Sequence, residues 1–310
     1  MAIWILLVVV AQLINSIVAI VDKYIVSSPE LPRPAAYAFY LSVLSALSVG
    51  VFLFSDIPIP LEGVAIPSLD NVSSPTTVVL FISLIAGAAL FGALVALFSA
   101  LQKADASDVF PVVGASSAVA ALILSFLLLN AVLTPNFAWG FLLLVAGTLV
   151  LSLFRFGYVS MWLSIMAGLL FGAHFVCLKV LFAETHFDNA FFWSRMGIVV
   201  IALGFLIFPF LRRQLTIPSR AARRRAGMLI VGNKVLAGLA SLMLLKAIEL
   251  GDVSIVQAMG GLQFAFLLGF AAIFGKGLPQ VCGEKCTPRQ LMHKTTAVLI
   301  IIAGFGVLFL

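Results

Sequence analysis

The stretch TTVVLFISLIAGAALFGALVALFSA, residues 76–100, holds no charged side chain over its whole length. One membrane-crossing helix needs about 20 consecutive apolar residues, so this stretch alone is long enough to span a bilayer. The 310-residue chain as a whole is also apolar, with 63% hydrophobic and 10% charged residues and a mean hydropathy of +1.22. This composition leaves too little polar surface for a water-soluble enzyme or a disordered protein.

Apolar runs broken by Pro, Gly and charge clusters predict an all-α integral membrane protein with ten spans. The first run has no basic leader and carries Gln12 and Asn15, so we interpret it as a helix and not as a signal peptide. The predicted spans are residues 2–22, 35–54, 76–100, 109–129, 136–153, 158–182, 189–210, 227–248, 253–274 and 294–310.

The distribution of basic residues predicts the orientation of these spans. Most of the 18 Lys and Arg residues fall in odd-numbered connections, and basic loops stay on the cytoplasmic side, which places both termini outside. The net charge of +6 has the same origin, so we expect no nucleic-acid partner. The run from Arg220 to Arg225 favours this topological role, with an anionic lipid patch as the alternative.

Two short segments match each other across the chain. LQKADASDV, residues 101–109, aligns with LKAIELGDV, residues 245–253, at a shift of 144. Lys23 aligns with Lys179 at a shift of 156, as does Tyr37 with Trp193. We therefore predict two five-helix repeats, residues 1–154 and 155–310, and an odd helix count inverts the second repeat relative to the first.

The helix count, the two halves and the repeated turns ADASDVFPVV and LGDVSIVQAM resemble the drug/metabolite transporter superfamily, EamA type. The resemblance implies an exporter of small metabolites such as amino acids, and the inverted halves favour alternating access. The positive bias within the spans favours a neutral, zwitterionic or anionic substrate, such as an organic anion. The high hydrophobicity and compact loops favour a prokaryotic cytoplasmic (inner) membrane, with an organelle membrane as the alternative. The resemblance also implies cytoplasmic termini, opposite to the charge count. Many members carry an acid where this chain has Asn130, and Glu284 is the candidate equivalent in the second half.

Polar side chains within spans are the candidates for binding a small-molecule substrate, because burying them in lipid is costly. Lys234, beside Asn233, is either a cationic anchor or a side chain that extends to the interface. His174 is either a gate or proton carrier, or a neutral group bonded between helices. For Lys179 and Arg195, which we place nearer span ends, interface anchoring is the default reading.

Further candidates are amides and helix-loosening residues. Gln12, Asn15, Ser16 and Ala19 share a helical face, and Gln257 precedes a glycine pair. These amides bind either substrate or a neighbouring helix. Candidate hinge or packing positions are Pro111, Gly114, Gly260 and Gly261.

Several expectations concern what the sequence lacks. All twelve acidic residues fall in connections or at span ends by this assignment, which disfavours cation–proton exchange on a buried carboxylate. Cys282, Cys286 and His293 form at most a partial metal site, so we expect no metal, no cofactor and no enzymatic activity. The alternatives are a flippase for polyprenyl-phosphate sugars, or a membrane enzyme or scaffold, and the protein is expected to be a monomer or homodimer.

Overall fold

The computed structural model describes residues 3–27, 33–56, 65–104, 106–129, 135–152, 157–207, 215 and 220–274, and scattered positions between 292 and 307. Every element in this part of the chain is a helix. The elements are α1 (Ile3–Ser27), α2 (Pro34–Leu44), the 3-10 helices η1 (Ser45–Phe54) and η2 (Leu69–Asn71), α3 (Thr77–Leu101), α4 (Ala106–Leu129), α5 (Pro135–Ser152), α6 (Tyr158–Glu184), α7 (Phe187–Phe205), α9 (Arg220–Leu250), α10 (Val253–Ala258) and α11 (Gly261–Phe274).

Six of the described helical segments are long and apolar enough to cross a membrane. They are Ile3–Ser27, Pro34–Phe54, Thr77–Leu101, Asp108–Leu129, Tyr158–Glu184 and Gly227–Leu250. Large apolar side chains also cover the outside, including Leu53, 80% exposed, and Phe81, 64% exposed. An apolar exterior of this kind indicates a membrane protein, because lipid, unlike water, favours it.

Helices overlap each of the first nine predicted spans, although α9 begins seven residues before its predicted start and residues 45–54 form the 3-10 helix η1. Helix α1 continues to Ser27, five residues beyond its predicted end, since no Pro or Gly interrupts residues 20–27. The ninth predicted span is divided into α10 and α11 around Met259 and Gly260. The tenth range, 294–310, lies largely outside the described residues.

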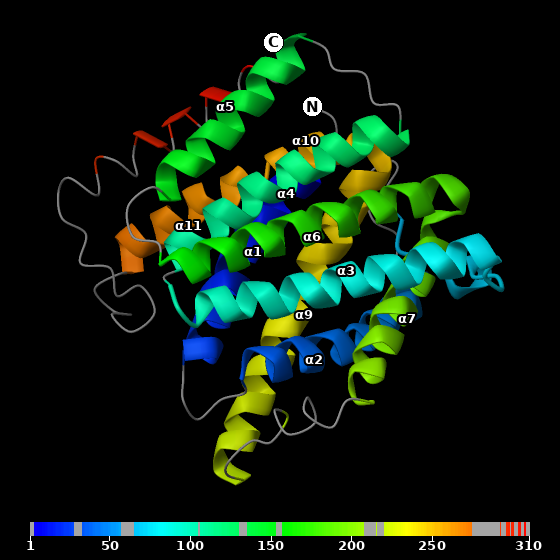
Figure 1. The fold of residues 1–310 in the computed structure, drawn as a ribbon. Coiled ribbons are helices and arrows are strands. Elements are labelled where there is room, and N and C mark those ends of the chain that lie inside the picture. Colours follow the sequence, from blue (N-terminus) through cyan, green and yellow to red (C-terminus); the bar gives the residue numbers. More distant parts are fainter. Residues whose placement is uncertain are drawn as a thin grey trace.

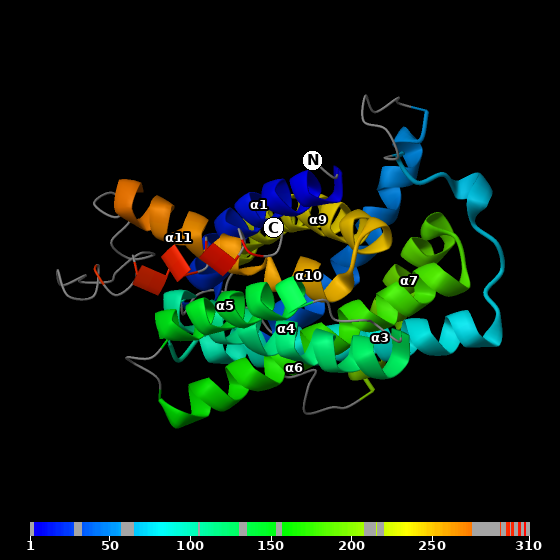
Figure 2. The same ribbon diagram turned by 90° about the horizontal axis from the view of Figure 1, so that it is seen from above.

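The helices form two layers. Figure 2 shows α1, α9 and α11 on one side of the molecule and α3, α4, α5 and α6 on the other. The most extensive packing pairs α6 with α3 and α4, α1 with α9, and α3 with α7. In Figure 1, α3, α4 and α6 run side by side, while α9 crosses behind them.

Glycines bring helices of the α3, α4, α6 and α7 group into backbone contact. A Cβ atom added at Gly87 of α3 would lie 2.7 Å from the carbonyl carbon of Gly197 in α7. One added at Gly172 of α6 would lie 2.6 Å from the carbonyl oxygen of Ser117 in α4. Only glycine permits approaches this close, so these positions fix how the helices pack.

Two lysines bind the carboxyl ends of other helices. The Lys23 ammonium donates to the carbonyls of Leu101 and Ala104, both at 2.7 Å, at the end of α3. The Lys179 ammonium donates to the carbonyls of Ile248, Glu249 and Gly251, at 2.7, 3.0 and 2.8 Å, at the end of α9. A helix end leaves carbonyls unpaired and carries partial negative charge, so a cation stabilises it. The lysines and helix ends that the sequence aligned therefore make the same kind of contact.

Candidate functional site

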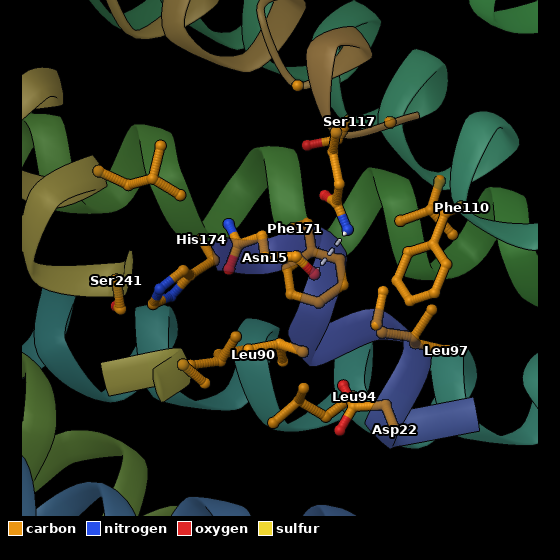
Figure 3. A pocket seen from close by; sticks show the side chains of 18 of the residues that line it. Asn15, Asp22, Leu90, Leu94, Leu97, Phe110, Ser117, Phe171, His174 and Ser241 are labelled. Carbon is orange, nitrogen blue, oxygen red and sulfur yellow. Dashed lines mark hydrogen bonds between the residues drawn. The ribbon is translucent and has the colours of Figure 1, made fainter. Parts of the chain in front are cut away.

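A cavity of about 260 Å3 lies between the two layers. Its walls come mainly from α1, α3, α4, α6 and α9, and α2, α7, α10 and α11 each contribute one or two residues. In the view of Figure 3, Asp22 lies at the bottom and Ser117 at the top, with His174 and Ser241 to the left. Leu90, Leu94, Leu97, Phe110 and Phe171 supply apolar walls between these polar groups.

The structure brings all six predicted substrate-binding residues to this cavity. Its lining includes Gln12, Asn15, His174, Asn233, Lys234 and Gln257. Within it, the Asn15 amide donates to Gln12 Oε1 at 3.4 Å, and the Ser117 hydroxyl donates to Gln257 Oε1 at 3.0 Å. These residues therefore belong to one site by position, and their binding role stays a prediction.

The four predicted hinge or packing positions have different surroundings. Gly114 and Gly260 line the cavity, and a Cβ at Gly114 would lie 2.9 Å from the Phe264 ring. Gly260 lies in the break between α10 and α11, and Gly261 begins α11. There the amide of Gly260 bonds the carbonyl of Gln257 three residues back, a 3-10 bond. Pro111, by contrast, lies inside α4, which continues through it.

The placement of Asp22 corrects the expectation that all acidic residues lie in connections or at span ends. Asp22 is five residues before the end of α1, is only 7% exposed and lines the cavity. The error came from ending the first span too early. The face that holds Gln12, Asn15 and Ala19 reaches Asp22 at the next spacing of three, and this signal was present in the sequence.

Asp22 joins three helices through hydrogen bonds. Its Oδ1 accepts from the Tyr37 hydroxyl of α2 and, at 2.7 Å, from the Asn233 amide of α9. That amide also donates to the Tyr37 hydroxyl oxygen at 3.3 Å. Sequence reasoning placed Tyr37 only in the repeat and missed it as a partner of Asp22. The network holds the carboxylate at a fixed place in the cavity wall.

Arg195 also lies deeper than we expected from the sequence. It is near the middle of α7, 5% exposed, and lines the cavity, so it is not an interface anchor. Its Nη2 donates to the Ser241 hydroxyl of α9 at 2.9 Å, and the guanidinium lies 5.1 Å from the Phe191 ring centre. Its Nε is buried and has no hydrogen-bond partner among the residues that the structure describes.

Lys234 gives the cavity a second cation. Its ammonium interacts electrostatically with Arg195, which repels it, and with Asp22, which attracts it. Lys246 and Glu249, outside the cavity lining, form an ion pair at 2.6 Å, whereas no such pair is present between any two of Lys234, Arg195 and Asp22. Lys234, Arg195 and Asp22 thus share a cavity without forming an ion pair with one another.

His174 is hydrogen-bonded between helices. Its Nδ1 lies 2.8 Å from the Ala86 carbonyl oxygen of α3, and that acceptor requires Nδ1 to carry a proton. The ring is 3% exposed and packs at an edge against Phe175. The interhelical bond that we weighed as the alternative role is therefore present.

Other predicted features fall outside the part of the chain that the structure describes. They are Asn130, Cys282, Glu284, Cys286 and His293, and the side chains of Arg220, Arg223, Arg224 and Arg225. Among the described residues, no group of three or more His, Cys, Asp or Glu side chains lies close enough to hold a metal ion.

Comparison with known proteins identifies the fold and no function. No family model matches the chain, and no curated relative matches it. A solved structure titled "Crystal structure of protein" superposes with a TM-score of 0.65 at 19% sequence identity, covering 98% of this chain and 96% of that one. The chain therefore shares an experimentally observed helical fold over nearly its whole length.

Proposed function

We propose that this protein is a secondary transporter of small metabolites that carry an anionic group, such as amino acids or organic anions. The observation that supports this most is a charged cavity inside an otherwise apolar helical bundle. A charged side chain at the centre of a membrane helix costs at least about 2.5 kcal/mol, so such residues usually serve a substrate or ion pathway.

The charge balance of the cavity supports an anionic group on the substrate. Lys234 and Arg195 are two cations that repel each other, and among the described residues of the lining Asp22 is the one acidic side chain. Buried cations without an ion pair are costly, and an anion bound between them relieves both their repulsion and their desolvation. The Ser241 hydroxyl and the free Nε of Arg195 lie beside this position as further hydrogen-bonding groups.

Alternating access by two inverted halves, residues 1–154 and 155–310, is the proposed mechanism. Two observations support it. Lys23 and Lys179 bind the ends of α3 and α9 in equivalent ways, and the α10–α11 break lies at the cavity, as broken helices do in many transporters. The proposed family is the drug/metabolite transporter superfamily, and the proposed location is a prokaryotic cytoplasmic membrane.

Ligand-dependent thermal unfolding of the purified protein tests the proposed site. The panel is succinate, alanine, 6-aminohexanoate, hexylamine and a polyprenyl phosphate. A compound that binds only the folded state, present at a hundred times its Kd, stabilises it by about 2.7 kcal/mol. We expect the unfolding midpoint to rise with an anion or zwitterion, and the rise to disappear in Lys234→Gln.

Lys246→Gln is the matched control, because Lys246 pairs with Glu249 at 2.6 Å and does not line the cavity. It should keep the wild-type response. A response to hexylamine alone, or an unchanged response in Lys234→Gln, would overturn the anion site. A response to the polyprenyl phosphate alone would favour a lipid-carrier flippase instead.

A further inference from the structure

The Asp22 carboxylate has one oxygen left for a ligand. Oδ1 accepts both hydrogen bonds of the network, from Tyr37 and from Asn233. Oδ2 accepts none from the described residues, and Asp22 lines the cavity. A carboxylate that is 7% exposed, held in place on one oxygen and unpartnered on the other, is a receptor for a positively charged donor.

Asp22 of α1 and Arg195 of α7 contact α9 at two different levels, meaning positions along the axis of that helix. Asp22 is held by Asn233, and Arg195 is held by Ser241, eight residues further along the helix. Eight residues correspond to about 12 Å along a helix axis. The short bonds of 2.7 and 2.9 Å tie each charged group to its own level.

The wall between these levels is apolar. Ala237 lies between the two levels on α9, and Leu90 and Leu94 of α3 line the same cavity. Lys234 directly follows Asn233, so its backbone lies at the Asp22 end of this interval. A ligand that crosses this interval therefore needs an uncharged middle and a charge at each end.

We infer that the cavity binds an extended zwitterion, with its carboxylate held by Arg195 and its ammonium held by Asp22. An aliphatic chain separates the two charges and lies along the apolar wall. The inference rests on the proposed function and deepens it, because it adds an ammonium subsite that a plain organic anion leaves empty. The separation of the two subsites also distinguishes ω-amino carboxylates from α-amino acids, whose two charged groups are attached to one carbon.

Four six-carbon probes separate these features in a binding titration on the detergent-purified full chain, followed by calorimetry. 6-Aminohexanoate has both charges at opposite ends, hexanoate lacks the ammonium, hexylamine lacks the carboxylate, and 2-aminohexanoate places both charges at one end. An ammonium hydrogen-bonded to a buried carboxylate contributes enough to change Kd about tenfold or more. We expect 6-aminohexanoate to bind at least about tenfold more tightly than each of the other three.

Asp22→Asn tests the subsite itself, because it removes the charge and keeps the size of the side chain. We expect the Kd of 6-aminohexanoate to rise about tenfold and that of hexanoate to stay the same or fall. Asp70→Asn is the control, because Asp70 is exposed, lies in η2 and is not part of the cavity lining.

Unfolding midpoints measured without ligand check that each variant is folded. If Asp22→Asn does not fold, Asp22→Glu, which keeps the charge, replaces it. The Glu variant should then keep the preference for 6-aminohexanoate over hexanoate.

Each outcome that differs from the expected order of binding overturns a stated part of the inference. Equal binding of hexanoate and 6-aminohexanoate removes the ammonium subsite and leaves the proposed anion transport standing. Tighter binding of 2-aminohexanoate removes the extended arrangement, and no binding of any probe removes the inference. Binding in the expected order without uptake into vesicles would overturn the transport proposal and keep the site.

Discussion

The two sides of the molecule pack in opposite ways. On the side of α3, α4, α6 and α7, backbones touch at Gly87, Gly172 and Gly197, and an added methyl group has no room. On α9, Gly232 and Gly238, which are not part of the cavity lining, have nothing within 4 Å of an added Cβ atom. The first group packs through backbone contacts at glycines, whereas these two α9 glycines leave room for a side chain. Figure 2 shows the two sides as separate layers.

The comparison indicates where a conformational change has room to occur. Close-packed helices change arrangement in discrete steps and resist small shifts. The α9 side meets the cavity through polar contacts between single side chains, such as Asn233 with Asp22 and Arg195 with Ser241. We therefore expect α9 and the α10–α11 break to move relative to the α3–α6–α7 framework.

The largest difference in stability that we expect is between the variants Gly87→Ala and Gly238→Ala. At Gly87 the new methyl group would lie 2.7 Å from Gly197 backbone atoms, and overpacking of this kind costs about 1–3 kcal/mol. At Gly238 the methyl group has space, and Ala is favoured over Gly in a helix by about 0.8–1 kcal/mol. Thermal unfolding in detergent should show a lower midpoint for the first variant and an equal or higher one for the second. Equal midpoints would remove the contrast between the two sides.

Lys23→Met and Lys179→Met test whether the two helix-end contacts are equivalent. Each removes an ammonium that donates to helix-terminal carbonyls, and bonds to charged groups contribute about 1.5–3 kcal/mol. Urea unfolding monitored by circular dichroism should show similar losses of stability for both. A large loss in only one of them would contradict equivalent roles in the two halves.

Tyr37→Phe tests the network on the cavity side. It removes one of the two donors to Asp22 Oδ1 and should lower the stability by about 1–2 kcal/mol. Tyr40→Phe is the control, because its hydroxyl donates to the Leu215 carbonyl at 3.0 Å, away from the cavity lining. The control should cost about 0.5–1 kcal/mol. If both variants have the same unfolding midpoint, the Asp22 network does not stabilise the cavity wall.

Trp193→Phe should give the smallest effect. The Trp193 indole donates to the Ser73 carbonyl at 2.9 Å near the surface, where water can replace it. We expect a loss of about 0.5 kcal/mol, measured in the same unfolding assay. Tyr37 and Trp193 are aligned by the sequence repeat. A loss as large as that of Tyr37→Phe would show that the two residues contribute equally to stability.

Hydrophobic patterning predicts most of the fold, because membrane helices must satisfy their backbone hydrogen bonds internally and be apolar outside. It predicts helix ends less well. In the sequence, a charged residue such as Asp22 or Lys23 marks the predicted end of a span. The partners that let the helix continue, Asn233 and the end of α3, are far away in the sequence.

The same limit applies to the candidate site. Gln12, Asn15, His174, Asn233, Lys234 and Gln257 stand out as polar residues in apolar runs, and they line one cavity. Arg195 stands out equally, but its depth depends on α7 packing against α3 at Gly87 and Gly197, a contact that no local pattern contains.

Access to the cavity from both sides of the membrane tests alternating access most directly. Ser117→Cys is placed in a chain whose Cys177, Cys282 and Cys286 are replaced by Ser, because Ser117 lines the cavity beside Gln257. A small, membrane-impermeant methanethiosulfonate is then applied separately to right-side-out and inside-out vesicles. We expect modification from both sides, slowed by a ligand that binds the site. Modification from one side only would contradict alternating access.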